Sequence, residues 1–358
     1  METPAYNEIA CKECGANLKF KPGTHHLVCD YCGTENEIAK PASDTPAAIE
    51  ELDLETALRN FESEPKLKVQ TVKCTNCGAM GTFEPNVSSS TCAFCDTPLV
   101  LSQAQTTTIH KPQYVLPFKI EERKAIENFN TWISKLWWAP GNLKTYASAD
   151  KVDGVYIPFW TYDCDTDTSY DGERGDDYTE TTTNANGETE TETKTRWSSV
   201  SGRIRKSFDD ILIAATKSLN KKKLNALEPW DLDQLMAYDD RYLSGFTTET
   251  YQIDLKAGFE EAKKYMDRKI ESAIEDDIGG DHQRIHQKNI RYFNPTFKHI
   301  LLPVWISAFR YKDKVYQFMV NARTGEVKGE RPYSTAKIVL AVIAGIAIIG
   351  TLVYLFSK

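Results

Sequence analysis

Eight of the nine cysteines lie in four Cys-x-x-Cys pairs. In each of two sets, 14 residues separate one pair from the next, and four thiolates at this spacing can close a tetrahedral zinc site. The sequence predicts two zinc ions, the first held by Cys11, Cys14, Cys29 and Cys32 and the second by Cys74, Cys77, Cys92 and Cys95. Because each set is complete with four ligands, no coordination position is open for catalysis, and both sites are interpreted as structural. A redox dithiol is the competing interpretation, but redox motifs do not occur as spaced pairs of pairs.

The two cysteine sets belong to a duplicated unit. A shift of 63 positions superimposes all four cysteines and also matches Gly15 with Gly78, Ala16 with Ala79, Phe20 with Phe83, Pro22 with Pro85 and Thr34 with Thr97. Glycine directly follows three of the four Cys-x-x-Cys pairs, where a left-handed backbone lets amides point at sulfur, and Asp96 takes the fourth such position. The pattern predicts two zinc ribbons, at residues 1–40 and 71–103.

The charge of the ribbons bears on nucleic-acid binding. Between residues 11 and 38, three lysines stand against four acidic residues, and between 74 and 101 there are two acidic residues and no basic one. A surface for nucleic acid needs several Lys or Arg side chains, with aromatic residues for stacking. The whole chain has a net charge of -8. We therefore expect the ribbons to bind protein rather than nucleic acid.

An acidic repeat resembles the start of a calcium loop. It reads Asp163-x-Asp165-x-Asp167, but the sixth position is Thr168 instead of glycine and the twelfth is Arg174 instead of glutamate. We interpret this stretch as a solvated loop, with weak cation binding as the alternative.

Other candidate active sites also lack their defining residues. His282 and His286 are one helical turn apart without the His-Glu-x-x-His arrangement, so we expect a polar helix face. Lys221–Lys223 is read as a solvated turn, and Cys164 as a buried, inert thiol. The sequence has no phosphate-binding Gly-x4-Gly-Lys-Ser/Thr loop, no Gly-x-Gly-x-x-Gly and no Gly-x-Ser-x-Gly. We expect a protein that is not an enzyme.

The stretch 338–356 contains 19 residues without a charge, about 28 Å as a helix, and is predicted to span a membrane as a tail anchor at 336–358. Lys328, Arg331 and Lys337 precede it, so the positive-inside rule keeps the N-terminal side in the cytoplasm. No secretory leader is recognised at the start of the sequence. We expect a single-pass protein of the inner (cytoplasmic) membrane with its body in the cytoplasm.

Between these parts the sequence predicts an acidic linker with one short helix at 41–70 and a mixed α+β domain at 104–335. The linker helix is expected to pack on a neighbouring ribbon. Helical stripes are predicted over 121–138 and from Asp254, as N-cap, to Gly279, with Ala273 as the last residue of the second stripe. The segment 178–197 alternates threonine with glutamate around Asn-Gly and predicts a projecting polar hairpin.

A repeated phrase suggests internal duplication of the α+β domain. Tyr156–Trp160 reads YIPFW and Leu301–Trp305 reads LLPVW, 145 positions apart. Proline within an apolar strand indicates an edge, a bulge or a strand start. The expected fold class is therefore α+β: two four-cysteine zinc ribbons, an internally duplicated central domain and one C-terminal transmembrane helix.

The ordered motifs are similar to a known bacterial family. They are the paired ribbons, the terminal span, and the segments 154–162 (GVYIPFWTY), 197–202 (WSSVSG), 302–305 (LPVW) and 320–325 (VNARTG). Together they resemble tail-anchored double zinc-ribbon proteins of the YdjG type, whose members are labelled TFIIB-type zinc-finger or primosomal-helicase-like proteins. The resemblance implies an association with membrane-stress systems, with PspA-like and SPFH (flotillin-like) proteins as partners. The helicase label lacks a nucleotide-binding loop to support it.

The sequence therefore favours a non-enzymatic membrane adaptor whose zinc ribbons recruit cytoplasmic proteins to the inner face of the membrane. A homo-oligomer is compatible with this role. The alternative is a membrane-tethered zinc-ribbon protein that binds nucleic acid. A third hypothesis is an enzyme with its site near 163–177.

Overall fold

The computed structural model describes residues 9–38, 49–60, 66–82, 89–100, 104–143, 152–183, 189–312 and 314–356. The first cysteine set lies in ribbon 1 (residues 9–38), which contains a three-stranded sheet formed by β1 (Leu18–Phe20), β2 (His26–Cys29) and β3 (Glu35–Glu37). The second set lies in ribbon 2 (residues 66–82 and 89–100), which contains β5 (Lys66–Lys73), β6 (Met80–Thr82), β7 (Ser89–Thr91) and β8 (Pro98–Val100). The next strand, β9 (Gln105–His110), pairs with β5.

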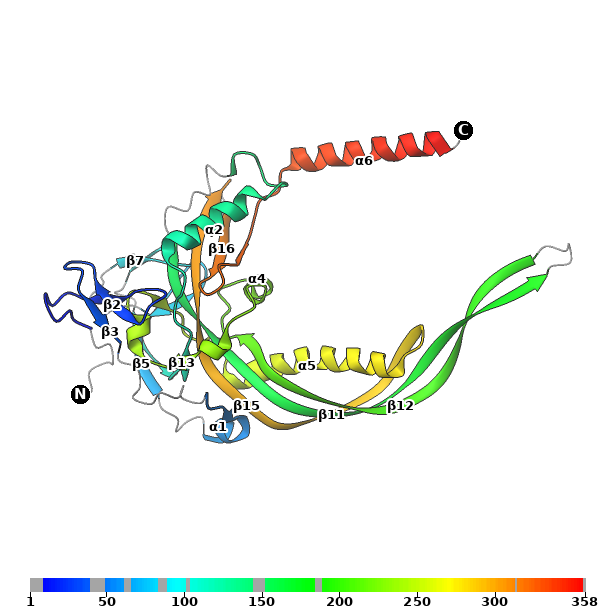
Figure 1. Cartoon of the computed structure of the whole chain (residues 1–358), viewed down its shortest axis with the longest axis horizontal. Helices are drawn as coiled ribbons and strands as arrows, with labels where there is room; N and C mark the ends of the chain where they lie inside the picture. The colour runs from blue at the N-terminus through cyan, green and yellow to red at the C-terminus, as the bar shows by residue number, and fades with distance from the viewer. Residues whose placement is uncertain are drawn as a thin grey trace.

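The body is organised around one curved sheet, which has nine strands among the described residues (Figure 1). Its long members are β11 (Asp153–Thr183), β12 (Thr189–Ala214) and β15 (His282–Tyr311). The shorter ones are β4 (Leu52–Asp53), β10 (Tyr114–Val115), β13 (Met236–Ala237), β14 (Thr247–Thr248), β16 (Lys314–Asn321) and β17 (Val327–Gly329). With the helices, these strands give the mixed α+β fold that the sequence predicts.

The three long strands continue beyond the body as a blade, defined here as residues 163–183, 189–208 and 282–296. Strand β15 begins at His282, which pairs with Gly175. Beyond this pair only β11 and β12 continue, as far as the pair Thr183–Thr189. The predicted polar hairpin is the far part of this blade, which projects from the body (Figure 1). Its predicted Asn-Gly turn lies outside the described residues.

Helix α5 (Leu255–Ile278) lies along the concave side of the long strands (Figure 1). The Asp254 carboxylate accepts a hydrogen bond from the Ala257 N–H at 2.8 Å, and Gly279 ends the helix at φ 65°, so both predicted helix ends are confirmed. The buried stripe ends at Ile274 and Ile278 rather than at Ala273. It packs on Tyr162 and on blade residues that include Cys164, and Cys164 is buried as predicted.

The two ribbons cover opposite faces of the body sheet. Neighbouring strand residues point to opposite faces, and Val115 packs in a cluster with ribbon 1, whereas Leu116 packs in a cluster with ribbon 2. Helix α2 (Glu122–Ser134) covers the ribbon 1 face through Phe129, whose ring lies 3.6 Å from that of Phe318. Smaller helices complete the described body: α4 (Lys221–Asn225), the 3-10 turns η2 (Leu232–Gln234) and η3 (Asp240–Leu243), and α1 (Leu54–Asn60).

Helix α6 (Thr335–Phe356) has no buried residue and is long and apolar enough to cross a membrane. It begins beside the residues that follow α2. The Ser334 N–H donates to the Trp138 carbonyl at 2.8 Å, and the Lys337 ammonium donates to the carbonyls of Trp137 and Ala139. From this attachment α6 extends away from the body, on the same side as the blade (Figure 1).

Four local predictions are wrong. Asp163, Asp165 and Asp167 lie on strand β11 and not in a loop. His282 and His286 lie on β15 and not on a helix, because the polar sequence around them pairs with β11. The triplet Lys221–Lys223 begins helix α4 instead of forming a turn. The linker helix α1 packs on β15, not on a ribbon, because Leu54 joins the cluster under α5.

The repeated Pro-containing phrases lie side by side, since Tyr156 of β11 pairs with Pro303 of β15 in an antiparallel register. Within the described residues these strands are neighbours in one sheet, and the predicted internal duplication is not seen. Pro158 of β11 lies one residue beyond the last pair with β12, Phe159–Ala214. Its missing N–H therefore removes no hydrogen bond between β11 and β12.

Candidate metal centres

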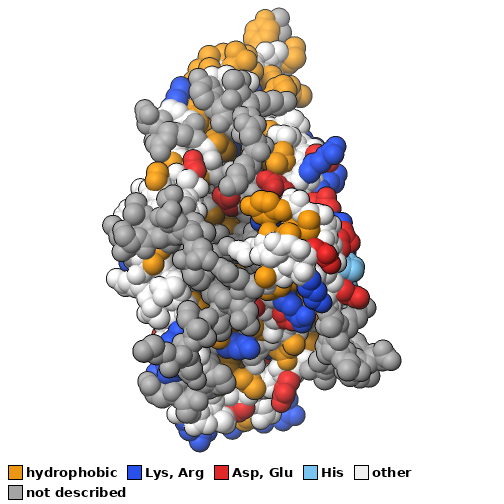
Figure 2. Space-filling model, turned by 90° about the vertical axis from the view of Figure 1, so that its left-hand side faces the viewer, with side chains coloured by type: hydrophobic (Ala, Val, Ile, Leu, Met, Phe, Trp, Pro, Cys, Tyr) orange, Lys and Arg blue, Asp and Glu red, His pale blue; other side chains and the backbone are white. Residues whose placement is uncertain are grey.

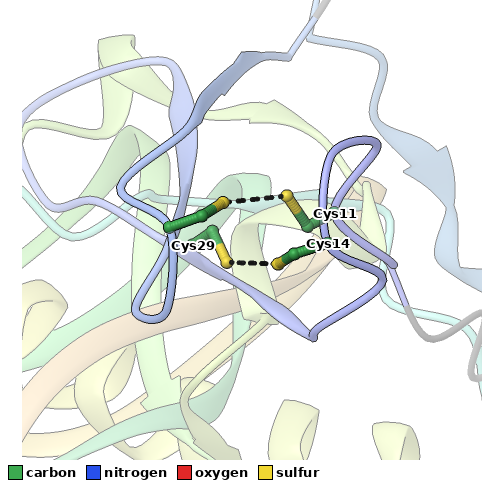
Figure 3. Close-up of side chains that lie close together, drawn as sticks. Cys11, Cys14 and Cys29 are labelled. Carbon is green, nitrogen blue, oxygen red and sulfur yellow. Dashed lines mark hydrogen bonds between the residues drawn. The ribbon is translucent and has the colours of Figure 1, made fainter.

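Ribbon 1 brings its four predicted ligands together. The Cys11 and Cys32 sulfurs are 3.5 Å apart, the Cys14 and Cys29 sulfurs are 3.4 Å apart, and all four lie within 4.8 Å of one another. Figure 3 shows the side chains of Cys11, Cys14 and Cys29 facing a shared space between two turns of the chain. Cys11 and Cys29 are buried, whereas Cys14 and Cys32 are exposed.

Ribbon 2 repeats this arrangement in a more enclosed setting. The pairs Cys74–Cys95 and Cys77–Cys92 each have sulfurs 3.6 Å apart, and again the four sulfurs lie within 4.8 Å. Cys77 is partly buried and the other three cysteines are buried.

The four Cys-x-x-Cys turns share one backbone geometry. In each, the residue after the second cysteine donates its N–H to the carbonyl of the first at 2.8–2.9 Å. That residue has a left-handed backbone in all four turns: Gly15 (φ 75°), Gly33 (72°), Gly78 (77°) and Asp96 (56°). The left-handed backbone predicted for the three glycines and for Asp96 is therefore confirmed. The repeated turn holds each pair of sulfurs on the same side of its loop.

The sulfur spacing fits a four-coordinate metal. A disulfide needs sulfurs about 2 Å apart, so the pairs at 3.4–3.6 Å are not disulfides. A tetrahedral ion with metal–sulfur bonds of about 2.3 Å places its sulfurs about 3.8 Å apart. The two tetrads could therefore hold two metal ions, each ligated by four cysteines.

A threonine supports the last cysteine of each tetrad. The Thr34 hydroxyl contacts the Cys32 sulfur at 3.1 Å, and the equivalent Thr97 hydroxyl contacts the Cys95 sulfur at 3.2 Å. The Thr34 contact lowers the pKa of Cys32 to about 6. A hydrogen bond from Cys92 lowers the pKa of Cys77 to about 5, and the pKa of Cys92 is raised in return. One cysteine of each tetrad, Cys32 or Cys77, thus favours thiolate, the form that binds metal, whereas the pKa values of Cys14 and Cys74 are raised.

The tetrads are built into the core of the protein. Cys11 and Cys29 belong to the buried cluster on one face of the body sheet, and Cys74, Cys92 and Cys95 belong to the cluster on the other. Main-chain hydrogen bonds add to this packing: the Phe20 N–H of ribbon 1 donates to Ser244, and the Thr250 N–H donates to Met80 of ribbon 2. A metal in either tetrad would therefore brace the body as well as its own ribbon.

A third group of possible ligands contains Glu51, Asp163 and Asp209, whose oxygens lie within 4.8 Å. The buried Lys298 ammonium already lies among these acids, 2.9 Å from Glu51 and 3.8 Å from Asp163, and it is 2.7 Å from Asp210. Burial, together with the neighbouring Glu51, raises the pKa of Asp163 to about 7. We therefore interpret the group as an ion-pair network that uses lysine as its cation.

The rest of the acidic strand is also paired. Asp165 accepts a hydrogen bond from Ser207 at 2.6 Å, and Asp167 pairs with Arg203 and Arg205 of β12. These partners could not be identified from the sequence because all of them lie on another strand, and no local motif indicates which strands will pair.

The chain is similar to the uncharacterized protein YdjG of Bacillus subtilis (strain 168), with 27% identity over 250 residues, which cover 66% of this chain and 68% of that protein. No family model matches the chain. No solved structure is significantly similar to it. The similarity to YdjG supports the resemblance drawn from the ordered motifs, whereas tail anchoring and partner proteins remain predictions.

Proposed function

We propose that this protein is a membrane-anchored adaptor without enzymatic activity that recruits cytoplasmic partner proteins to the inner face of the cytoplasmic membrane. Helix α6 is its anchor, and Lys328, Arg331 and Lys337 keep the body on the cytoplasmic side. Both metal centres hold zinc, which favours tetrahedral sites of four thiolates. Four cysteines complete each site, and this closed coordination supports a structural role.

The observation that carries the docking proposal is a comparison of the two ribbons at one equivalent position. Tyr31 and Phe94 each stand directly before the last cysteine of their tetrad, 63 positions apart. The Phe94 side chain is 2% exposed, and its carbonyl accepts a hydrogen bond from the Gln317 amide of β16. The Tyr31 side chain is 84% exposed. The same position therefore makes a protein contact in ribbon 2 and is free for one in ribbon 1.

Ribbon 1 is held to the body by a different surface. Phe20 packs at 5.2 Å from the Tyr242 ring, and the Ser244 hydroxyl donates to the Leu18 carbonyl at 2.5 Å. These contacts leave the turn that carries Tyr31 and Cys32 on the outside. We propose that the aromatic turn of ribbon 1 is the surface that captures the partner.

The charges of ribbon 1 favour protein over nucleic acid as its ligand. Lys19 pairs with Asp30 at 2.6 Å, and Lys21 pairs with Glu35 at 2.8 Å. Figure 2, which views the molecule from the ribbon side, shows lysine and arginine side chains among acidic and uncharged ones over the coloured part of that face. Paired lysines release few counterions on contact with phosphates, so nucleic-acid binding is the weaker alternative.

The resemblance to the YdjG type suggests the partners to probe, namely PspA-like and SPFH proteins of the same cell. The full chain is purified from detergent-solubilised membranes as wild type, Tyr31→Ala and Tyr265→Ala. Tyr265 is an exposed tyrosine on α5 and serves as the matched control. We expect wild type and control to retain the partner and Tyr31→Ala to retain at least tenfold less. Equal retention by all three contradicts capture by ribbon 1, and recovery of nucleic acid alone favours the alternative.

A second arm tests the anchor. Deletion of 338–356 is expected to release both the protein and its partner from the membrane fraction into the cytosol. A partner that stays at the membrane after this deletion contradicts the adaptor role.

A further inference from the structure

A basic cleft of about 560 Å³ lies at the base of α6. Its walls come from four separate elements: the end of α2, helix α4, strand β16, and the segment from β17 to α6. The lining combines cationic and aromatic side chains, namely Lys222, Lys223, Lys328, Arg331, Trp132, Tyr316 and Tyr333, with Glu330 as its acidic residue.

The cleft has an excess of positive charge that the protein itself does not neutralise. Lys223 pairs with Glu330 at 3.1 Å, and Lys328 pairs with Glu326 at 2.6 Å. In the described part of the chain, Lys222 and Arg331 form no ion pair, and the Arg331 guanidinium lies 5.2 Å from the centre of the Tyr333 ring. On a chain with a net charge of -8, this is a local site for an anion.

The position of the cleft places it at the membrane surface when α6 spans the bilayer. Tyr333 lines the cleft, and α6 begins two residues later at Thr335. Between Tyr333 and Thr335, the Ser334 N–H donates a hydrogen bond to the carbonyl of Trp138 in the corner that follows α2. In this corner Trp137 is 76% exposed and Trp138 is 38% exposed. Exposed tryptophans beside a span are typical of the layer between headgroups and hydrocarbon. Cleft and tryptophan corner therefore lie at headgroup depth, whatever the tilt of α6.

We propose that this cleft binds the phosphate-bearing headgroup of an anionic phospholipid. The inference rests on the proposed function only in requiring that α6 spans the membrane. Lys222 and Arg331 supply the free positive charges for the phosphate, and Trp132 and Tyr333 flank it. A headgroup is favoured over a soluble anion because the cleft residue Tyr333 lies two positions before the start of the span, where anionic lipids are concentrated. The bound lipid would fix the body against the membrane at the base of its anchor.

The experiment uses the full chain in a neutral detergent with equimolar phosphatidylglycerol and phosphatidylcholine. Native mass spectrometry counts the lipids retained by wild type, by Lys222→Gln/Arg331→Gln and by the control Lys264→Gln/Arg268→Gln. The control removes two charges from α5, away from the cleft. We expect wild type and control to prefer phosphatidylglycerol, and the cleft variant to lose roughly ten- to thirty-fold of that preference.

Each other outcome overturns the headgroup site. Equal loss in both double variants would indicate general electrostatic attraction, and an unchanged preference in the cleft variant would place lipid binding elsewhere. Displacement of phosphatidylglycerol by millimolar inorganic phosphate would identify a site for a soluble anion. Metal content and membrane fractionation are measured on the same samples. A wild-type chain that alkaline carbonate extracts from membranes would instead contradict the anchor, which separates this failure from a failure of the cleft.

Discussion

Glu51 and Lys298 are 247 residues apart in the chain, yet the Glu51 carboxylate lies 2.9 Å from the Lys298 ammonium. Lys298 is 3% exposed and lies where the blade joins the body, while Glu51 precedes α1 in the linker between the ribbons. The Thr296 hydroxyl also donates to Glu51, at 2.7 Å. The linker is thus fastened to the base of the blade, and α1 packs beside this ion pair.

Replacing Lys298 by methionine should destabilise the protein strongly. The change leaves Glu51, Asp163 and Asp210 close together without their cation. We expect the free energy of unfolding to fall by about 2–4 kcal/mol, below the full cost of breaking a buried pair because Glu51 and Asp210 remain partly exposed. Chemical denaturation measures this change in the free energy of unfolding. Arg203→Met is the matched control, and a similar loss in both variants would contradict a special role for Lys298.

The equivalent positions of the two ribbons should respond differently to truncation. Phe94→Ala removes a buried ring from the cluster under ribbon 2 and is expected to cost about 3–5 kcal/mol of stability. Tyr31→Ala removes an exposed ring and should change stability by less than about 0.5 kcal/mol. Thermal unfolding of the two variants checks this contrast. A large loss with Tyr31→Ala would mean that this ring packs on the protein.

Metal removal should loosen the body as well as the ribbons. Wild type is expected to contain two zinc ions per chain by elemental analysis, and Cys77→Ser to contain one. Because Cys74 and Cys92 share a cluster with Ile157 and Leu302, loss of the second ion should also lower the melting temperature of the body. The control Cys164→Ser changes a cysteine outside both tetrads and should keep two ions. Two ions retained by Cys77→Ser would contradict the assigned ligands.

His299 should make stability dependent on pH. Burial lowers its pKa to about 3, with a smaller contribution in the same direction from the nearby His110. In the unfolded chain the imidazole titrates near 6.5, so below that pH the unfolded state binds a proton that the folded state does not. This difference reduces stability by about 1.4 kcal/mol for each pH unit below 6.5.

The variant His299→Phe isolates this effect, since the ring already packs 4.3 Å from Trp160. We expect the free energy of unfolding, measured by chemical denaturation between pH 7.5 and 5.5, to depend less on pH in the variant than in wild type. Near pH 5.5 the difference in slope should correspond to about one proton. Metal content is checked at each pH. Parallel profiles for the two proteins would show that His299 is protonated in the folded state.

The end of the blade should be dispensable for folding. Asp177 and Thr195 are paired in the register, so an Asn-Gly turn can replace 178–194 without shifting the strands. The described residues removed are exposed, and stability should change by less than about 1 kcal/mol. Partner capture should persist, because the proposed docking surface is Tyr31. Loss of capture with an intact fold would move the docking surface to the blade.

The metal centres could be predicted from sequence because their information is local. The cysteine spacing, the glycine or aspartate after each pair and the match of Thr34 with Thr97 all lie within 24 residues in each repeat. The ends of α5 were also predictable, since Asp254 and Gly279 act on their own helix.

Most of the blade and the ribbon contacts were not predictable in this way. The polar hairpin at 178–197 was predicted, but nearer the body the apolar residues that face α5, such as Cys164 and Tyr170, are too sparse to indicate long strands, and His282 and His286 happen to stand four residues apart. Tyr31 and Phe94 are both aromatic, and only the fold decides which one is buried. The partners of Lys298 come from three distant segments, which no local pattern identifies.

Helix α6 and the blade leave the same side of the body and run in similar directions (Figure 1). The blade end carries glutamates such as Glu180 and Glu192, which hydrocarbon excludes. A membrane crossed by α6 in that direction would also have to contain the blade, so the chain has to bend after the cleft residue Tyr333, at the start of α6, when the helix inserts. The blade, about 65 Å of strand from Asp163 to Thr183, would then lie over the membrane surface and not through it. Each anchored copy would occupy far more membrane area than its single helix, which sets an upper limit on how densely copies can pack.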